Sequence, residues 1–199
     1  MNRTAFILAC SLLLGACSPR PTWSSEEKAV ILGGGDVMRV LTVADRDDSL
    51  LLRRECMMLL PEDIAAEEYA VLARRMVATV TSPEQDGVGI AGPQVGISRR
   101  VVAVQRFDKE GEPFEVYPNI EIVAMRGEKV QGAEGCLSVP GKRGQVSRWR
   151  DITISYTSPL TLRDTTEDVE GFTAVIFQHE TDHLSGVIYT DKADSVFVK

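Results

Sequence analysis

The stretch QHETDHLSG at residues 178–186 organises the fold of this chain and contains the only two histidines among its 199 residues. If the segment is helical, His179 and His183 lie one turn apart on the same face, close enough to bind one metal ion. Glu180 follows the first histidine and can reach a water molecule on that ion without being a ligand. This HExxH pattern predicts a metal-binding helix. The alternative is two solvated histidines on a helix surface.

A catalytic metal site built on this pattern needs a third protein ligand and one open position for water. Downstream of the helix no suitable residue follows: a third histidine would fall on Tyr189, and the remaining acidic residues are Asp191 and Asp194. The third ligand must therefore come from earlier in the chain. The stretch EGCLS at residues 134–138 supplies the candidate, because it carries the thiol of Cys136.

The beginning of the chain has the features of an export signal. Arg3 gives a positive start, and the apolar run at residues 5–16 is too short to span a bilayer as a helix. The run ends in LGAC, which resembles the lipobox of bacterial lipoproteins, where cleavage precedes the cysteine and lipid is attached to it. We therefore expect a protein of the cell envelope, held to a membrane by lipid on Cys17. The alternative is a translation start near Met38, which would give a cytoplasmic protein.

These features divide the chain into three parts. Residues 1–16 are expected to be the signal peptide, residues 17–36 the lipidated cysteine with a flexible tether rich in proline, serine and glycine, and residues 37–199 one folded domain. The formal net charge is −7, and it becomes −8 when the signal takes Arg3 away. The basic residues are not clustered, so the sequence predicts no nucleic-acid partner. The sequence does not indicate an oligomeric state.

Two of the four cysteines lie in the N-terminal segment, at Cys10 and Cys17. Of the other two, we expect Cys136 to be a metal-bound thiolate and Cys56 to be a thiol in the core. The alternative is a disulfide between them, which an oxidising compartment would permit.

A helix is predicted over residues 61–80, with a proline in its first turn, acidic residues in its first half and arginines later. Five residues form its expected apolar stripe: Ala65, Tyr69, Leu72, Met76 and Val80.

From residue 99 the pattern changes to that of strands. A β-branched run at residues 101–104 precedes a turn at 108–111, and alternating apolar residues follow at 114–122 and again at 152–156. A last helix is predicted to begin near Gly171 and to end at Gly186. Strands followed by a central helix predict an α+β fold with mainly antiparallel sheet.

Three separated stretches then agree with one family. GVGIAGPQVG at residues 87–96, EGCLS at 134–138 and QHETDHLSG at 178–186 resemble the three signature motifs of the peptide deformylases, in the same order and at similar spacing. The resemblance covers residues 37–189. It implies a peptide-deformylase-like α+β fold, with mainly antiparallel sheets around the central helix. It also implies a metal-dependent hydrolase that removes the N-formyl group from N-formylmethionyl peptides or proteins.

The resemblance also implies a role for each matching residue. The metal ligands would be Cys136, His179 and His183, holding one divalent ion, with Fe(II) favoured and Zn(II) or another first-row ion possible. Glu180 would be the general acid and base, and the side-chain amide of Gln94 and the backbone N–H of Leu137 would donate to the oxyanion. The N-formylated peptide would be bound by Val88, Gly89, Gly135 and Arg143.

Three features depart from the family pattern. Gly92 stands where the family usually has alanine, which is expected to loosen the loop that carries Gln94. Gly132 stands where members commonly place an apolar residue near the methionine pocket, which puts the preference for methionine in question. The third departure is the predicted export, because an exported enzyme cannot act on nascent chains at the ribosome.

Two other functions compete with a deformylase. One is a metalloamidase or peptidase of the envelope that acts on a different N-acylated peptide. The other is a non-catalytic binding module on the same fold. The presence of Glu180 and Gln94 favours an enzyme, because a binding module needs neither a general base nor an oxyanion donor.

Overall fold

The computed structural model describes residues 23–198, so the expected signal peptide and lipidation site lie outside the described part. The helices are α1 (Ser25–Leu32), α2 (Arg46–Leu52), α3 (Pro61–Ala65), α4 (Glu67–Val80) and α5 (Gly171–Leu184), with short 3-10 helices η1 (Gly92–Val95) and η2 (Tyr189–Asp191). The strands are β1 (Gly89–Ala91), β2 (Val101–Gln105), β3 (Phe114–Pro118), β4 (Glu121–Cys136), β5 (Val139–Thr157), β6 (Asp164–Glu170) and β7 (Ser195–Val198). Within residues 23–198, no helix is long and apolar enough to cross a membrane.

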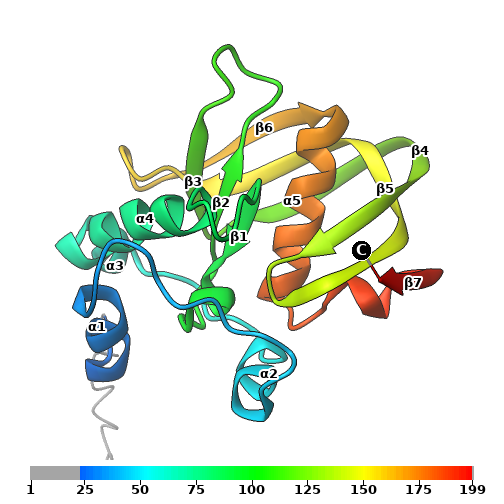
Figure 1. Cartoon of the computed structure of the whole chain (residues 1–199). Helices are drawn as coiled ribbons and strands as arrows, with labels where there is room; N and C mark the ends of the chain where they lie inside the picture. The colour runs from blue at the N-terminus through cyan, green and yellow to red at the C-terminus, as the bar shows by residue number, and fades with distance from the viewer. Residues whose placement is uncertain (1–22, 199) are drawn as a thin grey trace, which may run out of the picture.

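Two antiparallel sheets flank helix α5, as Figure 1 shows. The first sheet has the order β1-β2-β3, and the second has the order β4-β5-β6 with β7 paired to β5. Helix α5 packs against β5 as well as against β1 and β2, so it contacts both sheets. The predicted α+β class with mainly antiparallel sheet is confirmed. Strand β7 has no counterpart in the sequence prediction.

Strand β2 is buried on both faces, which explains its unbroken apolar run. Successive side chains of a strand point to opposite faces. Val101 and Ala103 belong to the core cluster that includes residues of α4. Val102 and Val104 belong to the cluster that includes residues of α5. The two long helices therefore cover opposite faces of the first sheet.

The single helix predicted over residues 61–80 is two helices, because Ala66 has extended backbone with φ −75° and ψ 153°. Asp63 holds the first short helix in place. Its carboxylate accepts the Leu60 N–H at 2.7 Å, and its backbone carbonyl accepts the indole N–H of Trp23 at 3.3 Å. The sequence pattern did not show this break, because it depends on contacts with a segment 40 residues away.

The break changes which side chains are buried. Ala65, expected in the apolar stripe, is exposed, and Ile64 is buried instead. The rest of the predicted stripe is confirmed, since the buried residues include Tyr69, Leu72, Met76 and Val80.

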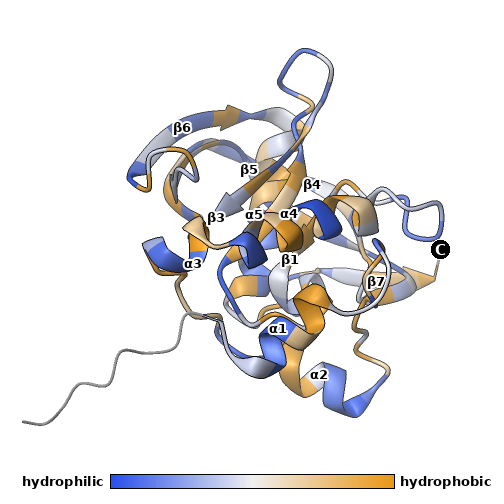
Figure 2. Ribbon diagram, turned by 90° about the vertical axis from the view of Figure 1, so that its left-hand side faces the viewer, coloured by the Kyte–Doolittle hydropathy of each residue, from blue (hydrophilic) through white to orange (hydrophobic). Residues whose placement is uncertain are grey.

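Residues 23–36 are not the flexible tether that their composition suggested. Helix α1 begins with a capping box, in which the Ser24 hydroxyl accepts the Glu27 N–H at 3.1 Å and the Glu27 carboxylate accepts the Ser24 N–H at 2.8 Å. Figure 2 shows α1 changing from hydrophilic to hydrophobic along its length. Ile31, near its end, is fully buried in the core cluster that contains α4.

Two buried arginines join α1 to the rest of the domain. The Nε of Arg99 donates to the Glu27 carboxylate at 2.6 Å. The Nη1 of Arg75 donates to the carbonyls of Val30 and Ile31 at 2.8 and 2.7 Å, which satisfies acceptors at the end of the helix. The folded domain therefore begins before residue 37, and the expected boundary at that point is wrong.

Strands β4 and β5 form a long antiparallel ribbon, which Figure 1 shows beside α5. Cys136 pairs with Val139 across a turn made by Leu137 and Ser138. The stretch around Cys136 is therefore a tight hairpin. This hairpin brings the thiol to the helix that carries both histidines.

Candidate active site

The structure brings Cys136, His179 and His183 together, although the thiol is more than 40 residues from the histidines in the sequence. Their ligand atoms all lie within 4.8 Å of one another. The Cys136 Sγ is 3.2 Å from the His183 Nε2, and the two imidazole centroids are 5.2 Å apart. A thiolate and two imidazoles suit Zn(II) and Fe(II), so these residues fit a divalent metal ion.

Glu134 orients the first histidine. Its Oε2 lies 2.8 Å from the His179 Nδ1. Burial opposes ionisation of this carboxyl, but hydrogen bonds from His179 and Arg148 hold the pKa of Glu134 at about 2. The ionised carboxylate can only accept, so the Nδ1 atom carries the proton. The Nε2 atom of His179 is then the ring nitrogen that would bind a metal ion.

A buried chain of charges extends from Glu134 to the surface. Arg148, which is 4% exposed, donates to both Glu134 oxygens at 2.7 and 3.0 Å. Its Nη1 donates to Asp182 at 2.6 Å, and Asp182 also accepts from Lys192 at 2.5 Å. None of these residues had a role predicted from the sequence. Glu134 could have been found, because it lies two positions before Cys136 on a strand, and a ligand histidine usually bonds to a carboxylate.

The two remaining cysteines have different surroundings, and both are free. The alternative of a disulfide between them is therefore contradicted, and Cys56 is a core thiol as predicted. Burial raises the pKa of Cys56 to about 12. Burial also acts to raise the pKa of Cys136. The charges and hydrogen bonds of His183 and His179 have a larger, opposite effect and hold that pKa well below the usual thiol value. Cys136 is therefore the thiol with thiolate character.

Glu180 lies beside this group and is 4% exposed. Its Oε2 has no hydrogen-bond partner among the described residues, and burial raises its pKa to about 7. Gly89 packs directly against it, since a Cβ on Gly89 would lie 2.5 Å from the Glu180 Oε1. A glycine is needed at that position because the carboxylate occupies the space of a side chain. Glu180 is thus held as a buried carboxyl that can carry a proton near neutral pH.

Gln94, on η1, points its amide nitrogen at the thiol. Its Oε1 accepts the Ala91 N–H at 2.8 Å, which fixes which end of the amide is oxygen. The Nε2 therefore faces the site, 3.6 Å from the Cys136 Sγ and 3.2 Å from the Ser138 Oγ. The side chain is 1% exposed. This geometry provides a neutral donor in a fixed orientation.

The loop that carries Gln94 is not loosened by Gly92, contrary to the expectation from the sequence. A Cβ on Gly92 would lie 2.8 Å from the carbonyl oxygens of both Arg99 and Ile97. The Ile97 N–H also donates to the Gly92 carbonyl at 2.9 Å. Glycine allows the two backbone segments to approach closely here, and this contact holds the loop.

A cavity of about 570 Å³ opens onto the site between α5 and the β4–β5 ribbon. Its wall includes the residues that the sequence analysis assigned to peptide binding, namely Val88, Gly89, Gly135 and Arg143, together with Gln94, Leu137, Cys136, His179 and Glu180. His183 is fully buried behind the wall. Strand β1 pairs only with β2, so its other edge is free to accept an extended chain.

Most of the folded region matches a known family. The model of the polypeptide deformylases matches residues 38–197. This chain belongs to the polypeptide deformylase family. It is 37% identical to peptide deformylase 1 of Clostridium perfringens over 145 residues, which cover 73% of this chain and 92% of that protein. It is 44% identical to the peptide deformylase of Desulforudis audaxviator over 117 residues, which cover 59% of this chain and 73% of the other.

Solved deformylase structures have the same fold. The peptide deformylase of Thermotoga maritima superposes with a TM-score of 0.69 at 30% identity, covering 80% of this chain and 99% of that one. A class I type b peptide deformylase from Acinetobacter baumannii with bound Met-Ala-Ser gives a TM-score of 0.69 at 33% identity, covering 78% and 98% of the two chains. The antiparallel sheets and helices of this chain are therefore those of the peptide deformylase fold.

Membership of the deformylase family agrees with the donor set at the site. Peptide deformylases are metal-dependent, and here a thiol and two imidazoles form a group that could hold one ion. The site residues named from the sequence line one cavity, apart from His183, which is buried behind its wall, and Cys17, which lies outside the described residues.

Proposed function

We propose that this deformylase hydrolyses the formyl C–N bond of N-formylmethionyl peptides, releasing formate and a free amino terminus. The observation that carries the proposal is the convergence of three kinds of group on one cavity. A thiol and two imidazoles can hold a metal ion, the carboxyl of Glu180 lacks a hydrogen-bond partner in the described part of the chain, and the amide of Gln94 has its donor end fixed toward the site.

Cys136, His179 and His183 would hold one divalent ion, with Fe(II) favoured by the resemblance and Zn(II) or another first-row ion compatible with the donors. When bound, such an ion lowers the pKa of a water molecule to about 7 and polarises a carbonyl group. Glu134 prepares the site for the ion by keeping the proton of His179 on Nδ1. The helix segment at residues 179–183 would thus act as the predicted metal-binding helix.

Glu180 is the proton carrier in this proposal. It accepts a proton from the attacking water and gives it to the leaving amine as the C–N bond breaks. Its pKa of about 7 suits both directions of transfer, and burial is the cause of that value. A carboxyl of ordinary pKa would accept the proton less readily at neutral pH.

Gln94 stabilises the negative charge that develops on the formyl oxygen. Its Nε2 donates to that oxygen, and the backbone N–H of Leu137 is the second donor. The amide needs no reorganisation during the reaction, because its oxygen is already bonded to the backbone of Ala91 at 2.8 Å. The donor is also neutral and keeps its state at any working pH.

The peptide lies extended along the free edge of β1. Val88 and Gly89 offer backbone groups on one side, and Gly135 of β4 offers them on the other, in the manner of an added strand. Arg143 pairs with Gly135 in register and lies at the wall of the same cavity, beside the expected path of the peptide backbone. A relative from Acinetobacter baumannii has been solved with Met-Ala-Ser bound.

We also propose that the protein is exported and anchored through lipid on Cys17, so that its substrates are formyl-peptides outside the cytoplasm. The support is the sequence of the first 17 residues. Trp23 is already buried, so at most residues 17–22 separate the lipid from the first buried side chain described. Six extended residues reach about 20 Å, which would hold the domain close to the lipid surface.

The test is formate release by the iron-loaded full-length chain under low oxygen, with formyl-Met-Ala-Ser and acetyl-Met-Ala-Ser as substrates. A deformylase releases formate from the first and leaves the second nearly intact. Equal rates on both would indicate a broader amidase, and no reaction with either would indicate a binding module.

A further inference from the structure

The cavity continues beyond the reaction centre as a slot along α5. Phe172, Ile176 and His179 repeat at helical spacing and line one side of it. From His179 to Phe172 the helix rises about 10 Å, at about 1.5 Å per residue. The slot therefore starts beside the candidate metal ligands and ends at an outer rim near Phe172, which is 48% exposed.

The opposite side of the slot is the inner face of the β4–β5 ribbon. Glu134 and Gly132 of β4 lie on this face and pair with Gly144 and Val146 of β5. Gly132 carries no side chain, and a Cβ built there would meet nothing within 4 Å. The middle of the slot is therefore open on this side.

Arg150 lies at the outer end of the same face. It follows Val146 and Arg148 at alternate positions of β5, and all three line the cavity. The charge of Arg148 is compensated by Glu134 and Asp182. Arg150 is exposed, and its side chain makes no hydrogen bond or ion pair with any residue from 23 to 198. It is thus an uncompensated cation in the wall of the slot.

We propose that Gly132 and Arg150 extend the specificity of this deformylase to a formylated first residue whose side chain ends in acceptor oxygens, above all a glutamate. This inference rests on the proposed deformylase function. The side chain of that residue enters the slot past Gly132, and its carboxylate accepts from the guanidinium of Arg150. A methionine thioether fills the same space but is only a weak acceptor.

The chemistry of arginine supports this pairing. A guanidinium offers two parallel N–H donors to a carboxylate, and such charge-assisted bonds are stronger than neutral ones. The arginine stem is long and apolar, so it can lie along the slot wall while its head reaches the ligand. A larger side chain at position 132 would occupy the space through which the two groups meet.

The test compares formyl-Glu-Ala-Ser, formyl-Gln-Ala-Ser and formyl-Met-Ala-Ser as substrates of the metal-loaded full-length chain. We expect kcat/KM for the glutamate peptide to lie within about tenfold of that for the methionine peptide. Arg150→Gln should lower the glutamate-to-methionine ratio by about tenfold or more, as expected for loss of a hydrogen bond between charged groups. Arg150→Lys should restore part of the ratio, and Gly132→Ile should shift it toward methionine.

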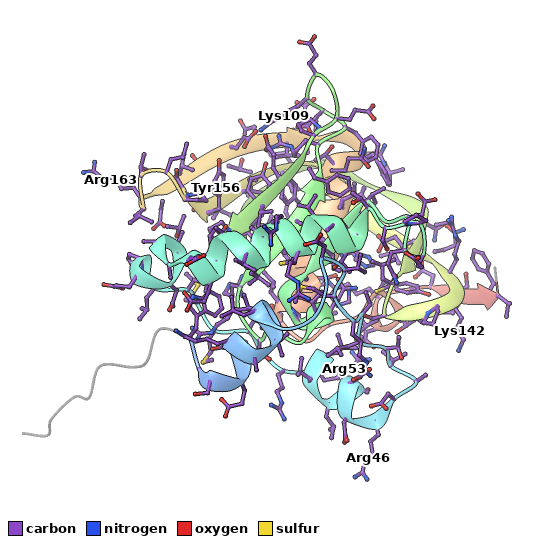
Figure 3. The ribbon with its side chains drawn as sticks, turned by 60° about the vertical axis from the view of Figure 1, so that its left-hand side comes forward. Arg46, Arg53, Lys109, Lys142, Tyr156 and Arg163 are labelled. Atoms are coloured by element: carbon purple, nitrogen blue, oxygen red, sulfur yellow. The ribbon has the colours of Figure 1, made fainter. Side chains whose placement is uncertain are left out.

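Arg163→Gln is the matched control. It removes the same charge from the turn between β5 and β6, which Figure 3 shows at the opposite edge of the molecule from Lys142 of the β4–β5 hairpin. The ratio should not change in this variant. Two results would overturn the proposal. One is a wild-type kcat/KM for the methionine peptide more than about a hundredfold above that for the glutamate peptide. The other is an equal change of the glutamate-to-methionine ratio in Arg150→Gln and Arg163→Gln.

Binding of the products provides a readout that does not depend on catalysis. Calorimetry on the metal-free chain should show that Arg150→Gln weakens the binding of Glu-Ala-Ser more than it weakens the binding of Met-Ala-Ser. If no formyl-peptide is hydrolysed but this difference appears, the deformylase function fails and the pocket assignment holds. If formyl-Met-Ala-Ser is hydrolysed and the difference is absent, only the pocket assignment fails.

Discussion

The Glu134 carboxylate lies 2.8 Å from the His179 Nδ1, and this contact determines which nitrogen of the imidazole is left for a metal ion. The carboxylate is ionised, with a pKa of about 2, and its two oxygens accept from the Nε and Nη2 atoms of Arg148. Because Nδ1 faces Glu134, the Nε2 of His179 is the ring nitrogen left to bind an ion. The same bond fixes the plane of the imidazole ring.

Glu134→Gln should lower the affinity for the metal ion by about 10- to 100-fold, the usual cost of removing such a partner. The amide keeps the size of the side chain but loses the charge that orients His179 and pairs with Arg148. Competition with a chelator measures the affinity. Glu128→Gln, at an exposed position on the same strand, should leave it unchanged. Equal affinities in the two variants would show that Glu134 does not support the ligand.

Glu180→Gln should separate proton transfer from metal binding. We expect it to keep a full complement of metal and to lose about 10²- to 10⁴-fold in kcat, the range for general acid–base catalysis. Cys136→Ala should instead lose the metal, because it removes a ligand. Metal content by elemental analysis, measured beside kcat, distinguishes these outcomes. Loss of metal from Glu180→Gln would show that the roles are assigned wrongly.

Gln94→Leu should cost about 3–4 kcal/mol in the transition state with little change in KM, because the lost bond strengthens only as charge develops. The leucine also leaves the Ala91 N–H without its acceptor, which should lower the free energy of unfolding by about 1–3 kcal/mol. The kinetic constants and the free energy of unfolding of this variant therefore both need to be measured. Ser138→Ala removes the hydroxyl that lies 3.2 Å from the same amide but keeps the donor, so its kcat should stay close to wild type. An effect of Gln94→Leu on KM alone would mean that Gln94 only positions the substrate.

The parts of the site that could be predicted from sequence are those whose chemistry needs unusual residues. The two histidines and Cys136 were found because few side chains bind metal, and Gln94 because it lies in a recognisable motif. Arg148 and Asp182 were missed, since a buried ion pair between a strand and a helix has no local pattern. The role of Gly92 was misjudged for a similar reason, because the carbonyls that exclude a side chain there come from residues 97 and 99.

Features of the fold that depend on neighbouring residues could likewise be predicted from the sequence, and those that depend on distant contacts could not. Strand β2 followed from its β-branched run, and the end of α5 just before Gly186 followed from a glycine signal. The break at Ala66 did not, and the short helix before it is bonded to a distant residue, Trp23, through the Asp63 carbonyl. Helix α1 was overlooked although its Ser24–Glu27 capping box is local. The prolines and glycines around it outweighed that signal.

Helix α1 should contribute to the stability of the domain. Ile31→Ala should lower the free energy of unfolding by about 2–5 kcal/mol, the usual range for truncating a fully buried aliphatic side chain. Leu32→Ala, at the next position but 56% exposed, should change it by less than about 0.5 kcal/mol. Urea unfolding of both variants measures the difference. Equal effects would mean that residues 23–36 behave as the tether first expected.

Cys17 should decide where the protein is found. Arg3, the apolar run at residues 5–16 and the LGAC sequence together predict cleavage before this cysteine and lipidation on it. One acyl chain binds membranes only marginally, so stable anchoring needs a second chain. The full-length chain should therefore fractionate with membranes, and its mature amino terminus should have the mass of a multiply acylated cysteine.

The Cys17→Ser variant should leave the membrane fraction without losing deformylase activity, because the site lies wholly within residues 23–198. A lipid-anchored enzyme outside the cytoplasm should also fail to replace a cytoplasmic deformylase, since it cannot meet nascent chains. A soluble cytoplasmic product that starts at Met38 would contradict the export proposal and would restore action on nascent chains. Such a product would also lack helix α1, and the packing of Ile31 predicts that it would be less stable than the longer chain.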